Sequence, residues 1–89
     1  MYYLYILKSL NYPKTYVGIT NEVDRRLFEH NSGYSLFSKR YMPWAILNLE
    51  EFGDRNAARV REKYYKSAAG RRKLKKLFLL PLFWLLRWM

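Results

Sequence analysis

The sequence of 89 residues contains no cysteine, a single histidine and only seven acidic residues. Without cysteine the chain can form neither a disulfide framework nor a thiolate metal site, which fits a reducing compartment, and we expect a cytoplasmic protein. No secretory signal is expected, because the apolar start lacks the basic residues that precede the hydrophobic part of such a signal. The other long apolar stretch, residues 77–89, is too short to cross a membrane as a helix.

The shortage of acidic residues leaves the chain strongly basic. Seventeen Lys and Arg residues stand against seven Asp and Glu, so the net charge is +10 at pH 7. Apolar residues make up 51% of the chain and aromatic residues 19%, a content that excludes a disordered tail. A basic domain of this size most often binds a polyanion, either nucleic acid or an anionic membrane. The length predicts one domain with a single modest core.

Alternating β-rich and amphipathic segments predict the fold. Strands are expected at residues 2–7, 15–20 and 44–52, and helices at 22–31, 55–68 and from about residue 71 to Pro81. Residues 32–43 are polar and basic and are predicted to form a mobile loop. The order β-β-α-β-α-α predicts an α+β fold, in which helices pack on a small three-stranded, mostly antiparallel sheet.

Short polar residues mark where the predicted helices begin. Thr20 or Asn21 is expected to cap the first helix, and Asp54 or Asn56 the second. Gly70 is expected to break the second helix.

The first predicted helix carries two side chains that could do chemistry. Arg26 and His30 are four residues apart and so share one face of the helix. A lone histidine is more often a surface or capping residue than a catalyst. Its position beside an arginine, just after a strand that contains Tyr16, makes it a candidate here.

Glu62 is the only acidic residue between Arg59 and Lys76, among nine Lys and Arg residues. It is either one partner of an ion pair on the helix surface, which contributes little, or a carboxylate facing a cleft. Two apolar stripes compete for the buried face of this helix: Ala58, Glu62 and Tyr65, or Ala57, Val60, Tyr64 and Ala68. Periodicity alone leaves both open.

Tyrosines, an arginine, a histidine and one carboxylate together suggest phosphodiester chemistry. A hard divalent cation such as Mg²⁺ takes oxygen ligands, and one carboxylate is enough when water and phosphate supply the others. A guanidinium group can stabilise the negative charge that develops on phosphorus.

The motifs that carry these residues resemble those of the GIY-YIG nuclease family. YLYIL at residues 3–7 and YVG at 16–18 stand where the family has its two signatures, although Tyr3 occupies the position of the first signature's glycine. RRLFEHN at 25–31 and NAARVREKYYKSAAGRRKLKK at 56–76 resemble the two later helices. The resemblance covers about residues 1–76 and is closest to small stand-alone bacterial members related to the nuclease domain of an excinuclease.

The resemblance implies a role for each candidate residue. Tyr5 and Tyr16 flank the scissile phosphate, and one of them acts as general base or orients the attacking water. Arg26 contacts the phosphate, His30 assists proton movement, and Glu62 binds a single Mg²⁺ or Mn²⁺ ion. Gly18 keeps the strand surface open, because a side chain there would stand where the DNA backbone must lie.

The basic run from Lys66 to Lys76 and the basic residues of the 32–43 segment predict that DNA binds on both sides of these groups. Besides Gly18, the expected DNA-binding residues are Lys39, Arg40, Lys66, Arg71, Arg72 and Lys73. The expected activity is a metal-dependent DNA endonuclease in repair or recombination. Because no DNA-recognition domain is attached, specificity is expected to come from a second copy of the chain or from a partner protein.

Two other functions compete with the endonuclease. One is a non-catalytic nucleic-acid-binding module of the same fold. The other is a membrane-surface protein that uses the basic helix and the apolar tail, which is the less favoured. Residues 1–76 are expected to form the nuclease-like domain and residues 77–89 an apolar tail that packs on the domain, joins two copies or inserts in a membrane.

Overall fold

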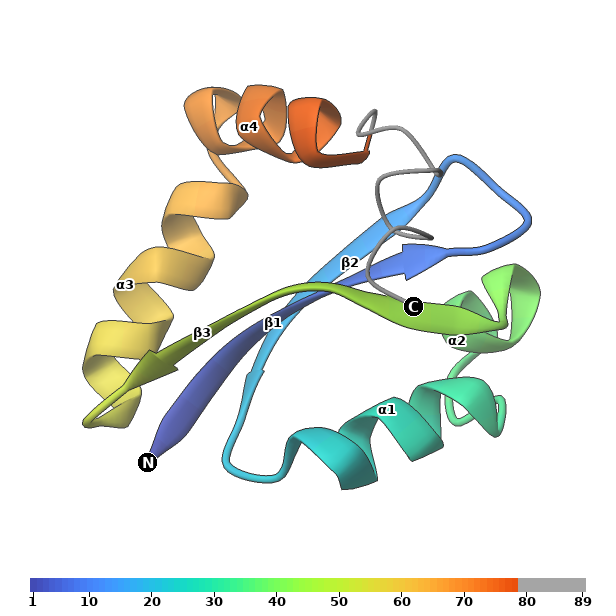
Figure 1. The fold of residues 1–89 in the computed structure, drawn as a ribbon, viewed down its shortest axis with the longest axis horizontal. Helices are drawn as coiled ribbons and strands as arrows, with labels where there is room; N and C mark the ends of the chain where they lie inside the picture. The colour runs from blue at the N-terminus through green and yellow to red at the C-terminus, as the bar shows by residue number, and fades with distance from the viewer. Residues whose placement is uncertain (79–89) are drawn as a thin grey trace, which may run out of the picture.

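Strand β1 (Tyr2–Ser9) lies at the centre of a three-stranded antiparallel sheet, between β2 (Thr15–Thr20) and β3 (Trp44–Phe52). The computed structural model describes residues 1–78 (Figure 1). The central position of β1 follows from its sequence, since Leu4–Leu7 is a continuous buried run that needs cover on both faces. The three predicted strands and the antiparallel sheet are confirmed.

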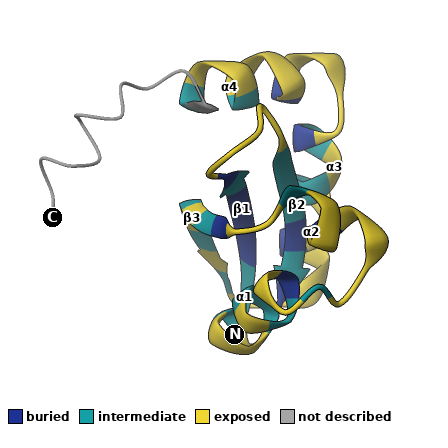
Figure 2. Ribbon diagram, turned by 90° about the vertical axis from the view of Figure 1, so that its right-hand side faces the viewer, coloured by how far each residue is buried: buried dark blue, intermediate teal, exposed yellow. Residues whose placement is uncertain are grey.

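Helices cover the two faces of this sheet (Figure 1). Helices α1 (Val23–Asn31) and α2 (Leu36–Tyr41) lie over the face that carries Tyr5 and Leu7. Helices α3 (Arg55–Tyr65) and α4 (Ala68–Phe78) lie over the face that carries Leu4 and Ile6. Side chains alternate between the faces of a strand, so β1 supplies both cores. Figure 2 shows the buried residues along β1 and the exposed outer side of α4.

Helix α2 stands where a mobile loop was predicted, and this prediction is wrong. Ser35 begins the helix: its side chain accepts a hydrogen bond from the backbone N–H of Ser38. The helix has six residues, too few to show an apolar period. The order of elements is therefore β-β-α-α-β-α-α, and the α+β class is unchanged.

The helix ends agree with the predictions in part. Asp54 caps α3, because its Oδ1 accepts a 2.8 Å hydrogen bond from the N–H of Ala57. The cap predicted for α1 is wrong: Glu22 is the first cap residue and makes no side-chain cap bond. Thr20 instead accepts a hydrogen bond from the N–H of Glu22, which forms a turn before the helix.

Gly70 does not break a helix but lies in the first turn of α4, because α3 already ends at Tyr65. A Cβ atom at this position would meet the carbonyl oxygen of Tyr64 and the Cα of Tyr65. The glycine therefore permits close contact between the start of α4 and the end of α3.

Helix α4 continues to Phe78, two residues past the expected domain boundary at Lys76. Leu77 packs against the core of Leu4, Ile6 and Tyr65. The expectations for residues 79–89 lie outside the described residues. Within residues 1–78, no helix has the length and hydrophobicity needed to span a membrane.

Candidate active site

Tyr5, Tyr16 and His30 form an aromatic cluster on the α1 side of the sheet. The rings of Tyr5 and Tyr16 are stacked, with centroids 6.0 Å apart, and the His30 ring lies 4.6 Å from that of Tyr16. The hydroxyl oxygen of Tyr5 lies 3.2 Å from Nε2 of His30. Tyr5 and His30 are buried, whereas Tyr16 is half-buried. Of the two phenols, Tyr16 is therefore the one that reaches solvent.

Gly18 is the partner of Tyr5 in the β1–β2 pairing. A Cβ atom at Gly18 would lie 2.5 Å from the Tyr5 hydroxyl oxygen and 3.0 Å from the Tyr16 ring. The expectation that this position stays open for DNA needs correction, because Gly18 is buried and the phenol of Tyr5 fills the space. The glycine is needed so that the two tyrosine rings can lie together.

Arg26 brings a positive charge to the cluster from α1. Burial raises the pKa of Tyr5 above its usual value, and the Arg26 guanidinium beside its hydroxyl opposes that rise. The phenol of Tyr5 is therefore protonated at neutral pH. Arg26 also makes an ion pair with Glu29, 3.3 Å between Nη1 and Oε1. Both side chains of this pair are half-buried, and the same guanidinium lies beside the Tyr5 hydroxyl.

His30 is held in its neutral form at neutral pH. Burial lowers its pKa below the usual value, and the positive charge of Arg26 lowers it further, against a smaller opposite effect of Glu29. Nδ1 of His30 lies 2.6 Å from the Ser38 hydroxyl, and Nε2 faces Tyr5. Both ring nitrogens thus have partners, so the ring orientation is fixed.

Ser38 is a member of the site that the sequence did not reveal. It is fully buried in α2, and besides His30 it contacts the hydroxyl of Ser35 at 3.1 Å. Its carbonyl accepts a 3.0 Å hydrogen bond from the indole N–H of Trp44. A serine in a polar, basic segment gives no signal of burial, and only the fold brings it to His30.

Asn31 fixes the end of α1 against the start of β3. Its Oδ1 accepts a 2.6 Å hydrogen bond from the N–H of Trp44, and its Nδ2 donates one of 3.1 Å to the Trp44 carbonyl. The same Trp44 donates to Ser38, so α1, α2 and β3 are joined at one point. This junction determines where His30 stands.

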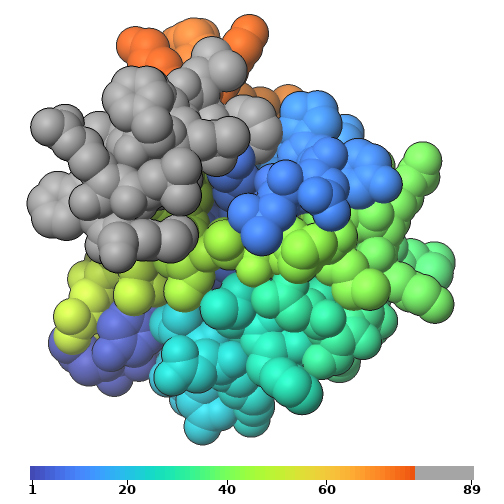
Figure 3. All heavy atoms as spheres, turned by 45° about the vertical axis from the view of Figure 1, so that its right-hand side comes forward, coloured from blue at the N-terminus to red at the C-terminus, as the bar shows by residue number. Residues whose placement is uncertain are grey.

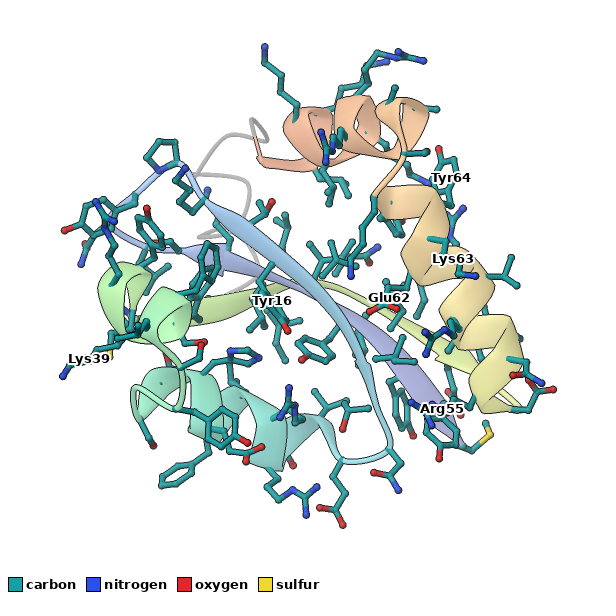
Figure 4. The ribbon with its side chains drawn as sticks, turned by 180° about the vertical axis from the view of Figure 1, so that it is seen from behind. Tyr16, Lys39, Arg55, Glu62, Lys63 and Tyr64 are labelled. Carbon is teal, nitrogen blue, oxygen red and sulfur yellow. The ribbon has the colours of Figure 1, made fainter. Side chains whose placement is uncertain are left out.

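Glu62 faces the sheet from α3, which decides between the two stripes. Ala58 and Tyr65 are buried, whereas Val60 of the rival stripe is 70% exposed. The Glu62 side chain is only 19% exposed to solvent. It points from α3 toward the sheet, where Tyr16 lies (Figure 4). Its carboxylate pairs with the ammonium group of Lys66 at 3.6 Å, and no described contact joins it to the tyrosine–histidine cluster.

Residues 1–78 contain no group of three or more His, Asp or Glu side chains that could enclose a metal. Glu62 alone still fits Mg²⁺ or Mn²⁺, since such ions are often held by one or two carboxylates with water and substrate phosphate. Within residues 1–78 its carboxylate makes one ion pair, with Lys66 at 3.6 Å, which leaves carboxylate oxygens for such an ion.

The basic residues expected to bind DNA lie on two sides of the molecule. Lys39 and Arg40 are exposed on α2, and Arg71, Arg72 and Lys73 are exposed on α4. Figure 3 shows α4 and the α1–α2 segment at opposite ends of the molecule. Tyr16 lies between Lys39 and the α3 residues Lys63 and Tyr64 (Figure 4). Positive charge therefore stands on both sides of the aromatic cluster.

A second polar network, which the sequence alone did not predict, attaches α3 to β3. Glu50 accepts hydrogen bonds from Arg61, at 2.9 Å, and from the hydroxyl of Tyr65, at 2.7 Å. The Arg61 guanidinium also lies over the Tyr64 and Tyr65 rings. The network fixes the helix that carries Glu62. No pattern signals it, because its members are 11 and 15 residues apart in the chain.

Comparison with known proteins gives consistent matches. The family model of the GIY-YIG catalytic domain matches residues 1–75. A UPF0213 protein of Haloquadratum walsbyi is 34% identical over 67 residues, which cover 74% of each chain. The solution NMR structure of a UPF0213 protein from Bacillus halodurans superimposes with a TM-score of 0.51 at 28% identity, covering 85% of this chain and 83% of that one.

Proposed function

The chain belongs to the GIY-YIG family, a family of nucleases, and from this we propose that it is a DNA endonuclease that hydrolyses phosphodiester bonds with one divalent cation. The observation that supports the proposal best is the cluster of Tyr5, Tyr16 and His30, with Arg26 beside it. These groups can position water, move a proton and neutralise a phosphate.

The surroundings of the two tyrosines suggest different tasks. Tyr16 is half-buried and reaches solvent, so it orients the attacking water, or takes up the proton of this water while its own hydroxyl proton passes to Tyr5. Tyr5 is buried and keeps its proton at neutral pH, so it acts as a donor and links Tyr16 to His30. Neutral His30 can accept a proton from this pair, while its Nδ1 remains bonded to Ser38.

Arg26 is the residue that stabilises the transition state. Its guanidinium lies at the cluster with a permanent positive charge, and such a group binds phosphate oxygens in a bidentate manner. Glu62 would hold Mg²⁺ or Mn²⁺, an ion that supplies Lewis-acid charge neutralisation when bound.

The biological setting follows only from the likeness to the nuclease domain of an excinuclease. On that ground we assign the activity to DNA repair or recombination in the cytoplasm. A second copy or a partner protein would then supply specificity.

The test is plasmid nicking by the full chain with Mg²⁺ or Mn²⁺, comparing the wild type with Glu62→Gln. This change keeps the size of the side chain but removes the charge that a hard cation needs. We expect loss of metal-dependent cleavage with DNA binding largely intact. Glu51→Gln, an exposed acid on β3, is the matched control and should remain active. Cleavage by Glu62→Gln at the wild-type rate contradicts the assignment of Glu62. If the wild-type protein binds DNA but does not cleave it, the non-catalytic module is favoured instead.

A further inference from the structure

A groove of about 300 Å³ opens between β2 and the junction of α3 with α4. Its lining includes the aromatic residues Tyr16 and Tyr65, the aliphatic Leu74 and the two cations Lys66 and Arg71. Gly70 lets the start of α4 approach α3 closely, so that Arg71 of α4 and Lys66 at the end of α3 both line the groove. Tyr16 therefore belongs both to the aromatic cluster and to the lining of this groove.

The charges of the groove indicate what it binds. No acidic residue is among its described lining residues, so the two cations there are not neutralised from within. Two cations together with aromatic and aliphatic side chains suit a phosphate group and the sugar or base attached to it. Since Tyr16 borders both places, a phosphate in the groove would be close in the strand to the one that is cleaved.

Lys66 forms an ion pair with a residue outside the described groove lining, and this partner is the candidate metal ligand. Its ammonium group lies 3.6 Å from the Glu62 carboxylate, one helical turn away. The Lys66 side chain is 61% exposed and Glu62 only 19% exposed, so the lysine is the partner that is free to move. One ammonium group thus stands between a carboxylate that would hold a cation and a groove that would hold a phosphate.

We propose that the groove binds a DNA backbone phosphate next to the scissile bond through Lys66 and Arg71, and that this phosphate draws Lys66 away from Glu62. The carboxylate then becomes available to the divalent cation, so DNA binding and metal binding support each other. This inference rests on the proposed function for the identity of the ligands, but it concerns binding and can be tested without cleavage.

The first test measures Mn²⁺ binding to the full chain without DNA by isothermal titration calorimetry. Lys66→Met removes the competing charge and keeps the aliphatic stem, so we expect Mn²⁺ to bind about two- to fivefold more tightly, the range of a partly exposed ion pair. Lys63→Met, an exposed lysine next to Glu62 in sequence and outside the described groove lining, should leave the affinity unchanged. Lys66→Met combined with Glu62→Gln should show no gain.

The second test measures the affinity for a labelled duplex with EDTA present, at several salt concentrations. Each phosphate contact contributes roughly −0.9 to the slope of log affinity against log salt. We expect Lys66→Met and Arg71→Met each to reduce the slope by up to about that amount. Arg55→Met, at the far end of α3 (Figure 4), is the matched control.

The third test titrates Mn²⁺ into the complex with a phosphorothioate duplex, which resists hydrolysis, and subtracts binding to the duplex alone. The duplex should raise the Mn²⁺ affinity of the wild type more than that of Lys66→Met. Equal Mn²⁺ affinities of wild type and Lys66→Met without DNA overturn the proposal, as do unchanged salt slopes in both groove variants. A protein that shows the expected coupling but cuts no DNA supports the groove and contradicts only the endonuclease.

Discussion

The hydroxyl oxygen of Tyr5 lies 3.2 Å from Nε2 of His30, although the two residues are 25 positions apart in the chain. The other nitrogen of the same ring contacts Ser38. A polar path therefore runs from α2 through α1 to the central strand, entirely within buried groups. A buried polar network of this kind is sensitive to the loss of any one member, so substitutions along the path should affect both stability and activity.

The first prediction separates the roles of the two tyrosines. Tyr5→Phe removes the hydroxyl that faces His30, so we expect a loss of roughly 1–3 kcal/mol in the free energy of unfolding and of about 10²–10⁴ in cleavage rate. Tyr16→Phe should lose a similar factor in rate with a smaller change in stability, because Tyr16 is half-buried. Urea denaturation and plasmid nicking measure the two effects. Two fully active variants would show that both rings serve only the core.

The second prediction concerns the protonation of His30, the only histidine in the chain. Burial and Arg26 lower its pKa below 6.5, so its NMR titration should have a midpoint under that value. Arg26→Gln removes the nearby charge and should move the midpoint upward. Arg25→Gln, whose arginine lies on the exposed side of α1, is the matched control and should leave it in place. A midpoint at or above 6.5 in the wild type contradicts the burial of a neutral ring.

The same shift has a consequence for stability. Between the lowered pKa of native His30 and about 6.5, the unfolded chain binds a proton that the native protein does not. The free energy of unfolding contributed by this group is therefore complete above about pH 6.5 and is lost as the pH falls through that window. In His30→Gln this part of the pH dependence should vanish, which denaturation curves at several pH values will show.

The third prediction tests Ser38. Ser38→Ala leaves Nδ1 of a buried histidine without its partner, so we expect a loss of roughly 1–3 kcal/mol in the free energy of unfolding. Ser32→Ala removes a hydroxyl whose hydrogen bond is exposed and should change stability by less than about 0.5 kcal/mol. If Ser38 positions the ring, its variant should also alter the pH dependence of cleavage, whereas a purely structural serine would lower activity and leave the pH profile unchanged.

The fold was predictable wherever a segment carries its own signal. The strands are continuous β-rich runs, and Asp54 stands directly before an amphipathic segment and caps it. Helix α2 has no such signal, because six residues show no period and its beginning depends on Ser35. The predicted end of α3 was wrong because a glycine usually breaks a helix, whereas Gly70 lets two helices approach closely.

The candidate site divides in the same way. Tyr5, Tyr16, Arg26 and His30 stand in motifs that the sequence displays, and the structure brings them together. The orientation of Glu62 could be decided only from tertiary contacts, since two apolar stripes fitted the sequence equally well. The contact of Ser38 with His30 and the groove beside Tyr16 both join segments that are distant in sequence. No local sequence pattern predicts that such segments lie close together.

The last prediction compares three glycines under the same substitution. At Gly18 a methyl group would lie 2.5 Å from the hydroxyl oxygen of Tyr5, whose side chain is buried, so the ring would have to shift within the core. Gly18→Ala should therefore cost about 1–3 kcal/mol and displace the phenol, so that cleavage falls more than stability alone explains. At Gly70 the methyl group would meet backbone atoms of Tyr64 and Tyr65, which yield less than a side chain, and the cost should be at least as large.

Gly53→Ala is the control for both variants, because nothing lies within 4 Å of the added Cβ atom. Its free energy of unfolding should stay within about 0.5 kcal/mol of the wild type. Gly70→Ala should also weaken DNA binding, since it shifts the start of α4 and with it Arg71, whereas Gly18→Ala should leave DNA affinity largely intact. Denaturation curves and duplex binding in EDTA distinguish these outcomes. A Gly18→Ala variant that is as stable and as active as Gly53→Ala would show that Tyr5 does not need the space beside it.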